Sequence, residues 1–519
     1  MNETYDVVVV GGGAAGLSGA VALARSRRSV LVIDDGKPRN APAGHMHNFL
    51  TRDNTPPADL LAAGRDELAH YGGELVDGRV AAVAGRADDF VVTLADGRAV
   101  RARRLLVATG LVDELPDIPG LADRWGRDVL HCPYCHGWET RDQRVGVIAS
   151  VHQAHLWRQL TPHVLLFLHG GPAPDAATAE ALAARAIPVV RERIGSLLVD
   201  SDKLSGVRLD SGAVVELDAL VVAPRFVARS QVFADLGLEP ADLVVDGRVY
   251  GSRIPAEAMG ATAVPGVWVA GNVTDLAATV IASAASGVAA GAAINADLVA
   301  ADTRAAVDEY RHQVHTMFER EAWEERYRAK PTIWSGNPNS QLVAEAADLA
   351  PGRALDVGCG EGADAVWLAR RGWRVTAVDI SSTALERAAA HASEAGVDTI
   401  EFVEADLRVT PPEPASYDLV TAQYMHLPPQ ARAELYARLA EAVAPGGTLL
   451  IVGHDPSDLH TTAHRAHFPD MMFTAGDVAG ALDPAAWEIV VAEYRPRTVT
   501  DAEGRDITIG DAVMVARRR

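Results

Sequence analysis

Cysteine is scarce in this 519-residue sequence, which contains only three. Such a small and odd number excludes the paired disulfide framework of a secreted protein, whereas a cytosolic chain keeps cysteine for chemistry. Cys132 and Cys135 form a C-x-x-C, and Cys359 stands alone in a glycine-rich segment. The cysteine positions therefore indicate where to look for chemistry.

Net positive charge and long apolar runs are also lacking. The formal charge of −21 disfavours binding to nucleic acid or to an anionic membrane surface. No basic segment followed by an apolar one opens the chain, and apolar runs such as residues 7–10 are far shorter than a membrane span. We therefore expect a cytoplasmic enzyme of about three or four domains, with small-molecule partners and with neither nucleic acid nor membrane as partner. A homodimer is left open.

The first glycine-rich segment follows a β-branched run at residues 6–10 and leads into an alanine-rich helical stretch. Its expected cofactor-contacting residues are Gly11, Gly13, Ala14, Ala15 and Gly16. Glycines in a G-x-G-x-x-G turn let the backbone approach a pyrophosphate at the positive end of a helix. A second strand, residues 29–33, ends on Asp34, whose carboxylate can accept hydrogen bonds from ribose hydroxyls. This order predicts a dinucleotide site, and a glycine turn without a ligand is the alternative.

Two distant segments resemble the thioredoxin-reductase superfamily and favour FAD over a nicotinamide at this first site. Residues 105–110 resemble the crossing strand of that family, and residues 266–275 resemble its late flavin-binding strand. The resemblance implies FAD contacts at Asn48, Val80, Thr109, Gly110, Gly271 and Asn272. The family has an aspartate at the last position, so we expect the amide of Asn272 to keep the ribityl hydrogen bond without the charge.

The C-x-x-C spacing of Cys132 and Cys135 lets two thiols close a small, reducible disulfide. By resemblance to the family, Cys135 faces the flavin and Cys132 exchanges with the substrate sulfur. The histidine that follows the second cysteine, His136, makes this motif similar to that of GliT-like dithiol oxidases. A histidine here is suited to act as an acid or base toward thiols. Attachment of a c-type haem, half of a zinc site and an inert pair are the alternatives. The first needs export and the second needs further ligands, and the sequence indicates neither.

The segment after the cysteine pair corresponds to the NADPH-binding unit of the family, but its turn is poor in glycine. Ala149, Ser150 and Val151 stand where glycines would admit a pyrophosphate, and no adjacent arginines follow residues 164–168. NADPH use is therefore left open, and we expect dithiol oxidation with oxygen as acceptor. His45 and His47 are candidates for lining the substrate cleft, with a surface role as the alternative.

The segment at residues 354–362, Ala-Leu-Asp-Val-Gly-Cys-Gly-Glu-Gly, repeats the strand-to-glycine-loop pattern with an acid at its start. It resembles motif I of class I S-adenosylmethionine-dependent methyltransferases, and the later motifs follow in order. The resemblance implies S-adenosylmethionine contacts at Asp356, Gly358, Gly360, Gly362, Asp379 and Asp406. An NAD-binding unit is the alternative, and we expect Cys359 to have a packing role.

Residues 323–327 with Trp334 resemble the N-terminal lid of TehB-like and thiopurine-type methyltransferases, which act on soft or small acceptors. Tyr424 and His426, after the fourth expected strand, are candidates for the acceptor pocket. The histidines near the other rim are His454, His460, His464 and His467. They could bind a metal, but we expect none, because exposed histidines more often line a pocket or face water.

Together these patterns predict an α/β protein, a two-domain FAD/NAD(P)-binding Rossmann-like oxidoreductase followed by a class I methyltransferase Rossmann-like domain. The expected parts are FAD-binding residues 1–115, an NAD(P)-binding-like domain at 116–244, FAD-binding residues 245–300, a helical connector and lid at 301–335, and a methyltransferase domain at 336–519.

The predicted function is thiol–disulfide exchange on a small-molecule thiol or disulfide, together with methyl transfer to a small acceptor for which sulfur is favoured. One alternative is an NADPH-dependent reductase with an independent detoxifying methyltransferase. Another is a methyltransferase gated by the redox state of the flavin site.

Overall fold

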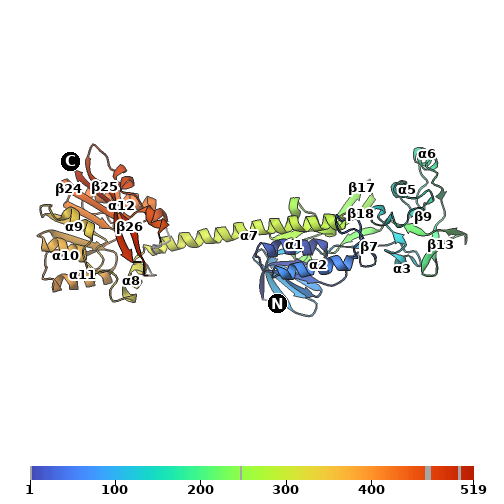
Figure 1. Ribbon diagram of the computed structural model, residues 1–519, viewed down its shortest axis with the longest axis horizontal. Coiled ribbons are helices and arrows are strands. Elements are labelled where there is room, and N and C mark those ends of the chain that lie inside the picture. The colour runs from blue at the N-terminus through green and yellow to red at the C-terminus, as the bar shows by residue number, and fades with distance from the viewer. Residues whose placement is uncertain (1–2, 246–247, 462–468, 501–503) are drawn as a thin grey trace. The chain divides into compact units, whose positions relative to one another are not determined.

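The computed structural model describes residues 3–245, 248–461, 469–500 and 504–519. The chain forms two compact units, Met1–Thr303 and Arg304–Arg519, each with its own sheets and hydrophobic core (Figure 1). Both units combine helices with largely parallel sheets, so the predicted α/β fold class is confirmed.

The first unit is built on a sheet of order β3-β2-β1-β6-β5-β4, in which β19 also pairs with β6. Its strands are β1 (Thr4–Val10), β2 (Val30–Asp34), β3 (Glu74–Asp77), β4 (Val80–Arg86), β5 (Asp89–Leu94), β6 (Ala99–Val107) and β19 (Val267–Val269). Continuous valine and leucine runs suit parallel strands covered on both faces, and all of β2 is buried. Val10 pairs with Val107, and Val107 with Val269. The carboxyl ends of three strands therefore lie side by side.

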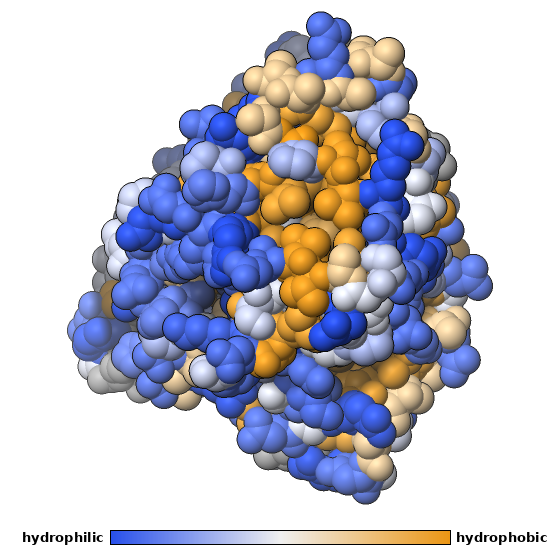
Figure 2. Space-filling model, turned by 90° about the vertical axis from the view of Figure 1, so that its right-hand side faces the viewer, coloured by the Kyte–Doolittle hydropathy of each residue, from blue (hydrophilic) through white to orange (hydrophobic). Residues whose placement is uncertain are grey.

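A smaller parallel sheet of order β11-β10-β9-β15-β8 follows in the same unit. Its strands are β8 (Val129–Leu130), β9 (Val145–Ile148), β10 (Val164–Phe167), β11 (Val189–Val190) and β15 (Ala219–Val221). The helices between these strands are α4 (Pro133–His136), α5 (Val151–Trp157) and α6 (Ala176–Ala184). Two further sheets contain β12 (Ile194–Asp200), β13 (Lys203–Leu209) and β14 (Val214–Glu216), and β7 (Leu111–Glu114), β16 (Arg225–Ala228), β17 (Ala241–Val245) and β18 (Arg248–Arg253). Figure 2 views the end of the unit that carries α5, α6 and β13, and shows an apolar patch surrounded by hydrophilic side chains.

Helix α7 (Val280–Met317) closes the first sheet beside α1 (Ala14–Arg25), as Figure 1 shows. The two backbones meet at glycine. A Cβ at Gly287 would lie 2.0 Å from the carbonyl oxygen of Ala15, so only glycine fits at this contact. The fully buried residues of this side of α7 are Ala290, Ile294 and Leu298.

Helix α7 runs without a break across residues 300 and 301, where the predicted FAD-binding part was divided from the predicted helical connector. The helix is continuous for 38 residues, because no glycine or proline follows Gly291 within it. By length and composition, its stretch Val280–Val314 could also cross a membrane. The uninterrupted apolar runs of the sequence do not indicate this, because polar residues are spaced along the helix. Core helices of soluble proteins pass the same test, and this helix has one face in the core of the first unit.

The second unit has one seven-stranded sheet of order β22-β21-β20-β23-β24-β26-β25, in which only the pairings of β26 are antiparallel. Its strands are β20 (Arg353–Val357), β21 (Arg374–Asp379), β22 (Ile400–Glu404), β23 (Tyr417–Gln423), β24 (Val443–His454), β25 (Trp487–Thr500) and β26 (Asp506–Arg518). Its α-helices are α8 (Arg320–Ala329), α9 (Ser340–Ala346), α10 (Ala363–Arg370), α11 (Ser382–Glu394), α12 (Pro429–Ala442) and α13 (Ala475–Gly480). The strand order reverses between β20 and β23, and ligands of such sheets bind outside the carboxyl ends at this point.

Candidate active sites

The first unit contains a cavity of about 830 Å³ that is lined by both the glycine-rich turn and the cysteine pair. This volume lies within the roughly 300–1,000 Å³ typical of ligand sites. The predicted residues on its wall are Gly11, Gly13, Ala14, Ala15, Asp34, His45, His47, Asn48, Val80, Thr109, Gly110, Cys132, Cys135, His136, Gly271 and Asn272. Gly16 does not line the cavity.

Steric contacts shape the glycine-rich turn at the start of α1. Gly11 has a φ of +107°, and a Cβ there would lie 2.4 Å from the carbonyl oxygen of Ala108. A Cβ at Gly16 would lie 1.8 Å from the carbonyl oxygen of Gly11, so Gly16 seats the helix against the turn. Nothing lies within 4 Å of the Cβ position of Gly13. The turn thus presents open backbone at a positive helix end, as an anion site requires.

Asp34, at the end of β2, is buried and has a partner on each oxygen. Oδ1 accepts a hydrogen bond from the backbone of Gly12 at 3.1 Å, and Oδ2 accepts one from Arg65 at 2.8 Å. A carboxylate can accept about four hydrogen bonds, so it retains capacity for ribose hydroxyls. The sequence pattern gave no sign of Arg65.

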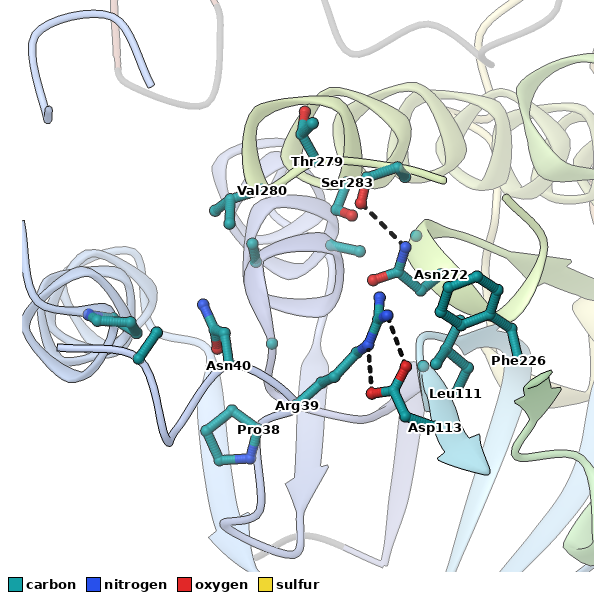
Figure 3. A pocket seen from close by; sticks show the side chains of 18 of the residues that line it. Pro38, Arg39, Asn40, Leu111, Asp113, Phe226, Asn272, Thr279, Val280 and Ser283 are labelled. Carbon is teal, nitrogen blue, oxygen red and sulfur yellow. Dashed lines mark hydrogen bonds and ion pairs between the residues drawn. The ribbon is translucent and has the colours of Figure 1, made fainter. Parts of the chain in front are cut away.

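Asn272 shows how an amide can occupy the position of the family's aspartate. Its Nδ2 donates to the carbonyl oxygens of Asp275 and Ala278 at 3.0 and 2.9 Å. Figure 3 shows its oxygen facing the cavity. The amide thereby holds the loop before α7 and still presents an acceptor to a ligand.

The cysteine pair lies at α4, with the two Sγ atoms 2.7 Å apart. Hydrogen bonds lower the pKa of Cys132 to about 7, chiefly the one from the thiol of Cys135, although burial opposes the change. The same bond and burial raise the pKa of Cys135. The pair is therefore asymmetric, because near neutral pH Cys132 is the thiolate and Cys135 keeps its proton.

Two histidines flank the pair. Burial lowers the pKa of His136, although Glu139 opposes the shift, so its imidazole is neutral at pH 7 and able to accept a proton. Burial also lowers the pKa of His131, whose Nδ1 lies 2.9 Å from the carbonyl oxygen of Val222.

The predicted pocket histidines differ in their surroundings. His47 stands between two carboxylates, with Nδ1 3.3 Å from Asp53 and Nε2 3.3 Å from Glu139. Asn48 donates from Nδ2 to the carbonyl oxygen of Tyr134 at 2.6 Å. Both residues therefore fasten their loop to the cysteine-bearing segment. His45 is exposed at the cavity wall.

Sequence reasoning missed Arg39, whose guanidinium enters the same cavity (Figure 3). Its Nε and Nη2 donate to the two oxygens of Asp113 at 2.9 and 2.7 Å. Its guanidinium carbon lies 5.0 Å from the ring centre of Phe226. Arg39 and Asp113 are 74 positions apart, so no local motif connects them.

The turn after β9 has a backbone suited to glycine but no glycine. Ala149 has a φ of +54° and keeps its Cβ, and Ser150 caps α5 by accepting from the backbone of Gln153 at 3.2 Å. After β10, Arg193 comes from a later segment and places Nη1 2.6 Å from the Cβ position of Gly170. A cation is thus present at this loop although the sequence shows no adjacent arginine pair there.

In the second unit the glycines after β20 all have positive φ, +68° at Gly358, +54° at Gly360 and +84° at Gly362. Asp379, at the end of β21, accepts hydrogen bonds from the backbones of Gly360 and Ser381 at 2.9 and 3.0 Å. The acid of the second strand therefore also holds the glycine loop in place.

The other two acids of this site are in contrasting states. Asp356 is buried, and its Oδ2 has no hydrogen-bond partner among the described residues. Burial, together with nearby Asp364 and Asp379, raises the pKa of Asp356 well above its usual value. Asp406 is paired with Arg408 through both oxygens at 2.9 and 2.7 Å, so an adenine contact would have to share this carboxylate.

Two buried acids attach the predicted lid segment to the rest of the unit. The first is Glu324, which belongs to α8 and contacts the amino end of α11. It accepts hydrogen bonds from the hydroxyls of Ser382 and Thr383 at 3.0 and 2.6 Å. Burial raises its pKa, but hydrogen bonds from Thr383, Ser381 and Ser382 outweigh this effect and lower the pKa to about 2. A carboxylate at a helix amino end is stabilised by the helix dipole as well.

Glu361 in the glycine loop provides the second fastening. It is buried and accepts from the backbone of Trp334 at 3.2 Å and from Arg387 at 2.9 Å. The indole Nε1 of Trp334 donates to the hydroxyl of Tyr327 at 3.0 Å. The two atoms lie 2.9 and 3.1 Å from the position that a Cβ would take at Gly360, which is closer than an ordinary van der Waals contact. The lid thus covers the glycine loop with two aromatic side chains.

Tyr424 and His426 lie after β23 in one ring cluster with His454, whose ring centre is 4.6 and 4.5 Å from theirs. Tyr424 donates its hydroxyl to buried Asp511 at 3.0 Å, and burial raises its pKa to about 12. Nε2 of His426 accepts from the backbone of His454 at 3.0 Å. The two predicted residues therefore lie in one cluster of rings with His454.

The histidines of the other rim do not gather in the described part of the chain. His460 is exposed, and His464 and His467 lie outside the described residues. Within the described ranges no group of three or more histidine, cysteine or acidic side chains is arranged to hold a metal. Cys359 is buried in the core beside β20.

Comparison with known proteins assigns the two units. Residues 5–291 match the pyridine nucleotide-disulphide oxidoreductases, and residues 354–447 match a family of methyltransferase domains. The first match spans more than half of the chain, and the chain belongs to the pyridine nucleotide-disulphide oxidoreductase family. Its second unit carries a methyltransferase domain, so both resemblances and the enzyme assignment are confirmed. The first family implies use of FAD and NAD(P), and the second implies S-adenosylmethionine.

Three similar proteins illustrate the relationship. The thioredoxin reductase sirT of Leptosphaeria maculans is 32% identical over 58% of this chain and 96% of its own length. The crystal structure of HlmI is 44% identical, covers 60% of this chain and 98% of that chain, and has a TM-score of 0.56. An oxidoreductase from Agrobacterium tumefaciens is 33% identical over 57% of this chain and 99% of that chain, with a TM-score of 0.54.

Proposed function

We propose that the chain is a bifunctional enzyme that oxidises a small dithiol to its disulfide with FAD and methylates a small sulfur acceptor with S-adenosylmethionine. One observation carries the first activity: the glycine turn, Asn272 and the cysteine pair line the same cavity. The open backbone at Gly13 fits the pyrophosphate of FAD, and the acceptor oxygen of Asn272 fits its ribityl group. Electrons can therefore pass between the cysteines and the cofactor within one enclosed site.

The cysteine pair begins the oxidation as a disulfide. A substrate thiolate attacks Sγ of Cys132, forms a mixed disulfide and displaces Cys135 as a thiolate. The second substrate thiolate attacks the substrate sulfur of the mixed disulfide and displaces Cys132, whose low pKa makes it a good leaving group. Two thiol protons are released, and neutral His136 is placed to accept one. FAD, when bound, would take the electron pair as the cysteine disulfide reforms and would pass it with two protons to dioxygen, giving hydrogen peroxide.

Dioxygen is preferred over NADPH as redox partner because the turn after β9 carries the Cβ of Ala149 and a capping serine instead of glycines. The runner-up is an NADPH-dependent reductase. The observation that favours it is Arg193, a cation beside Gly170 that could pair with a phosphate.

Oxygen uptake by the FAD-loaded full chain tests the first activity. With dithiothreitol in air we expect one hydrogen peroxide for each disulfide formed, and no turnover in Cys132→Ser. Turnover of a disulfide substrate that consumes NADPH, without dithiol-dependent oxygen uptake, would establish the reductase instead.

The second activity is supported by the glycine loop of the second unit. S-adenosylmethionine, when bound, would supply the methyl group from its sulfonium. The unpartnered Oδ2 of Asp356 and the partly engaged Asp379 fit a cofactor that brings its own N–H and O–H donors. Tyr424 stays protonated and Nε2 of His426 is engaged, so neither is placed as a base. A thiol suits such a site because it ionises near pH 8.5 without much help.

Labelled methyl transfer by the full chain tests the acceptor class. We expect dithiothreitol to be methylated faster than a catechol or a primary amine of similar size. A preference for oxygen or nitrogen acceptors would remove the proposed link between the units, in which one closes a disulfide and the other caps free thiols of the same compound.

A further inference from the structure

Arg39 is held rigidly at the cavity wall. Asp113 fixes it through two hydrogen bonds, and Phe226 lies under its guanidinium. Phe226 and Asp113 are register partners in the β7–β16 pair, so the two contacts come from one piece of sheet. Figure 3 shows the guanidinium rising from its loop into the cavity between Asp113 and Asn272.

This arrangement leads directly to the redox pair. The ring of Phe226 contacts His131 edge-on, with ring centres 5.2 Å apart, and it contacts Tyr250 at 5.1 Å. His131 immediately precedes Cys132, and all of these residues line the same cavity. Arg39 and the segment that carries Cys132 therefore contact the same aromatic ring, that of Phe226.

The burial of the pair separates it from ordinary surface ion pairs. The side chain of Asp113 is 7% exposed and that of Arg39 is 31% exposed. Arg225 and Glu114 pair on the same two strands, but their side chains are 46% and 53% exposed. A largely buried pair costs desolvation energy that it often does not recover, so its stabilising effect alone gives little reason to place one at a cavity wall.

We propose that Arg39, fixed by Asp113 and Phe226, is a positioning residue that maintains positive potential at the redox pair and so keeps Cys132 in its reactive thiolate form. The proposal rests on the proposed thiol–disulfide function. Arg39 acts through Cys132. This field is constant with pH because a guanidinium keeps its charge at every relevant pH.

The titratable groups around the pair are consistent with this role. Those that face Cys132 or its neighbours His131, Cys135 and His136 are Tyr250, Arg39, Asp113, Glu139 and His47, together with the neighbours themselves. The side-chain hydrogen bond from Cys135 lowers the pKa of Cys132 most, backbone hydrogen bonds from Cys135 and Tyr134 lower it further, and Arg39 adds a smaller lowering. Arg39 also opposes the rise in the pKa of Cys135. Among these groups Arg39 is the permanent cation.

The test is the pH dependence of Cys132 alkylation in the reduced, anaerobic full chain, read by fragment-ion mass spectrometry that distinguishes Cys132 from Cys135. The wild-type midpoint is expected at about pH 7. Arg39→Gln should move it up and slow alkylation at pH 6 by roughly threefold. Asp113→Asn, which leaves the cation without its counter-charge, should move the midpoint down and speed alkylation at pH 6 by roughly threefold.

Opposite signs for the two variants distinguish electrostatics from structural damage, which would shift both in the same direction. The double variant Arg39→Gln/Asp113→Asn leaves no unpaired charge and should have a midpoint between those of the single variants, so the proposal stays testable if Arg39→Gln fails to fold. Arg225→Gln and Glu114→Gln are the matched exposed controls and should leave the midpoint unchanged.

Unchanged midpoints in both single variants, or shifts of the same sign, would overturn the role of Arg39. The measurement needs no dithiol turnover, so its failure leaves the proposed function standing. Failure of dithiol oxidation, in turn, leaves these midpoints readable.

Discussion

Cys132 and Cys135 lie three positions apart and yet have opposite pKa shifts. One hydrogen bond between the sulfurs produces most of the difference, since it stabilises the thiolate of the acceptor and retains the proton of the donor. A thiol with a pKa near the ambient pH is an effective attacking and leaving group. In the proposed mechanism, exchange with a substrate therefore begins and ends at Cys132.

Single-cysteine variants should show this asymmetry. Treated with an aromatic disulfide reagent at pH 7, Cys135→Ser should form a stable mixed disulfide, because Cys132 attacks and no neighbouring thiol resolves the product. Cys132→Ser should react more slowly by roughly threefold or more, because burial still raises the pKa of Cys135 after the bond with Cys132 is lost. Intact mass against time measures both, and equal rates would contradict the assigned order.

Residues in contiguous motifs were predictable, and residues paired over long distances were not. The cysteines, His136 and the glycines of the turn are recognisable from spacing alone. Arg39 and Asp113 come together only in the folded sheet that contains β7, so no local sequence pattern near either residue predicts the pair. Sequence also suggested a cleft role for His47 without showing the two carboxylates that surround it.

Helices α8 and α11 of the second unit are joined by one carboxylate, that of Glu324 in the predicted lid. Glu324 binds the amino end of α11 and brings the lid against the body of the unit. Its partners follow Asp379 in sequence, and so the lid is anchored to the same turn that holds the glycine loop.

Acid should release this lid. The pKa of Glu324 falls from its usual 4.5 to about 2 in the folded unit, so its contribution to stability is complete above about pH 4.5 and is lost as the pH falls toward about 2. Denaturant unfolding followed by tryptophan fluorescence at pH 6 and pH 3 should therefore show a smaller pH effect in Glu324→Gln than in wild type. Glu394→Gln, at an exposed position of α11, is the control and should behave as wild type.

The contact of α7 with α1 should be intolerant of side chains. Gly287→Val places carbon where the carbonyl of Ala15 lies 2.0 Å away, and overpacking of this kind costs about 1–3 kcal/mol or more. Because Ala15 belongs to the glycine-rich turn, loss of bound flavin should accompany the loss of stability.

Ala285→Val, at an exposed position of the same helix, is the matched control. Thermal unfolding and flavin absorbance after gel filtration measure the two effects. Equal behaviour of Gly287→Val and Ala285→Val would show that the contact between α1 and α7 is not required.

Among the helices and strands, the strand–loop–helix units were predictable, because the spacing of their apolar residues and their glycine turns are local features of the sequence. The extent of α7 was not, since alanine-rich and charged segments share one helix and nothing in its second half breaks it. The loop after β10 is a similar case, because Arg193 reaches it from beyond the next strand.

Across the whole chain, two families with separate cores occupy separate units. In the function proposed above, one site exchanges electrons with thiols and the other transfers a methyl group, and a free dithiol is a substrate that both chemistries can use. The central claim is that the first unit receives its electrons from a dithiol.

The most direct test is the absorbance of the bound flavin in the anaerobic full chain during titration with NADPH and then with dithiothreitol. We predict that NADPH leaves the flavin oxidised, that the dithiol bleaches it, and that air restores the colour. Bleaching by NADPH at stoichiometric amounts would contradict this account and establish a reductase.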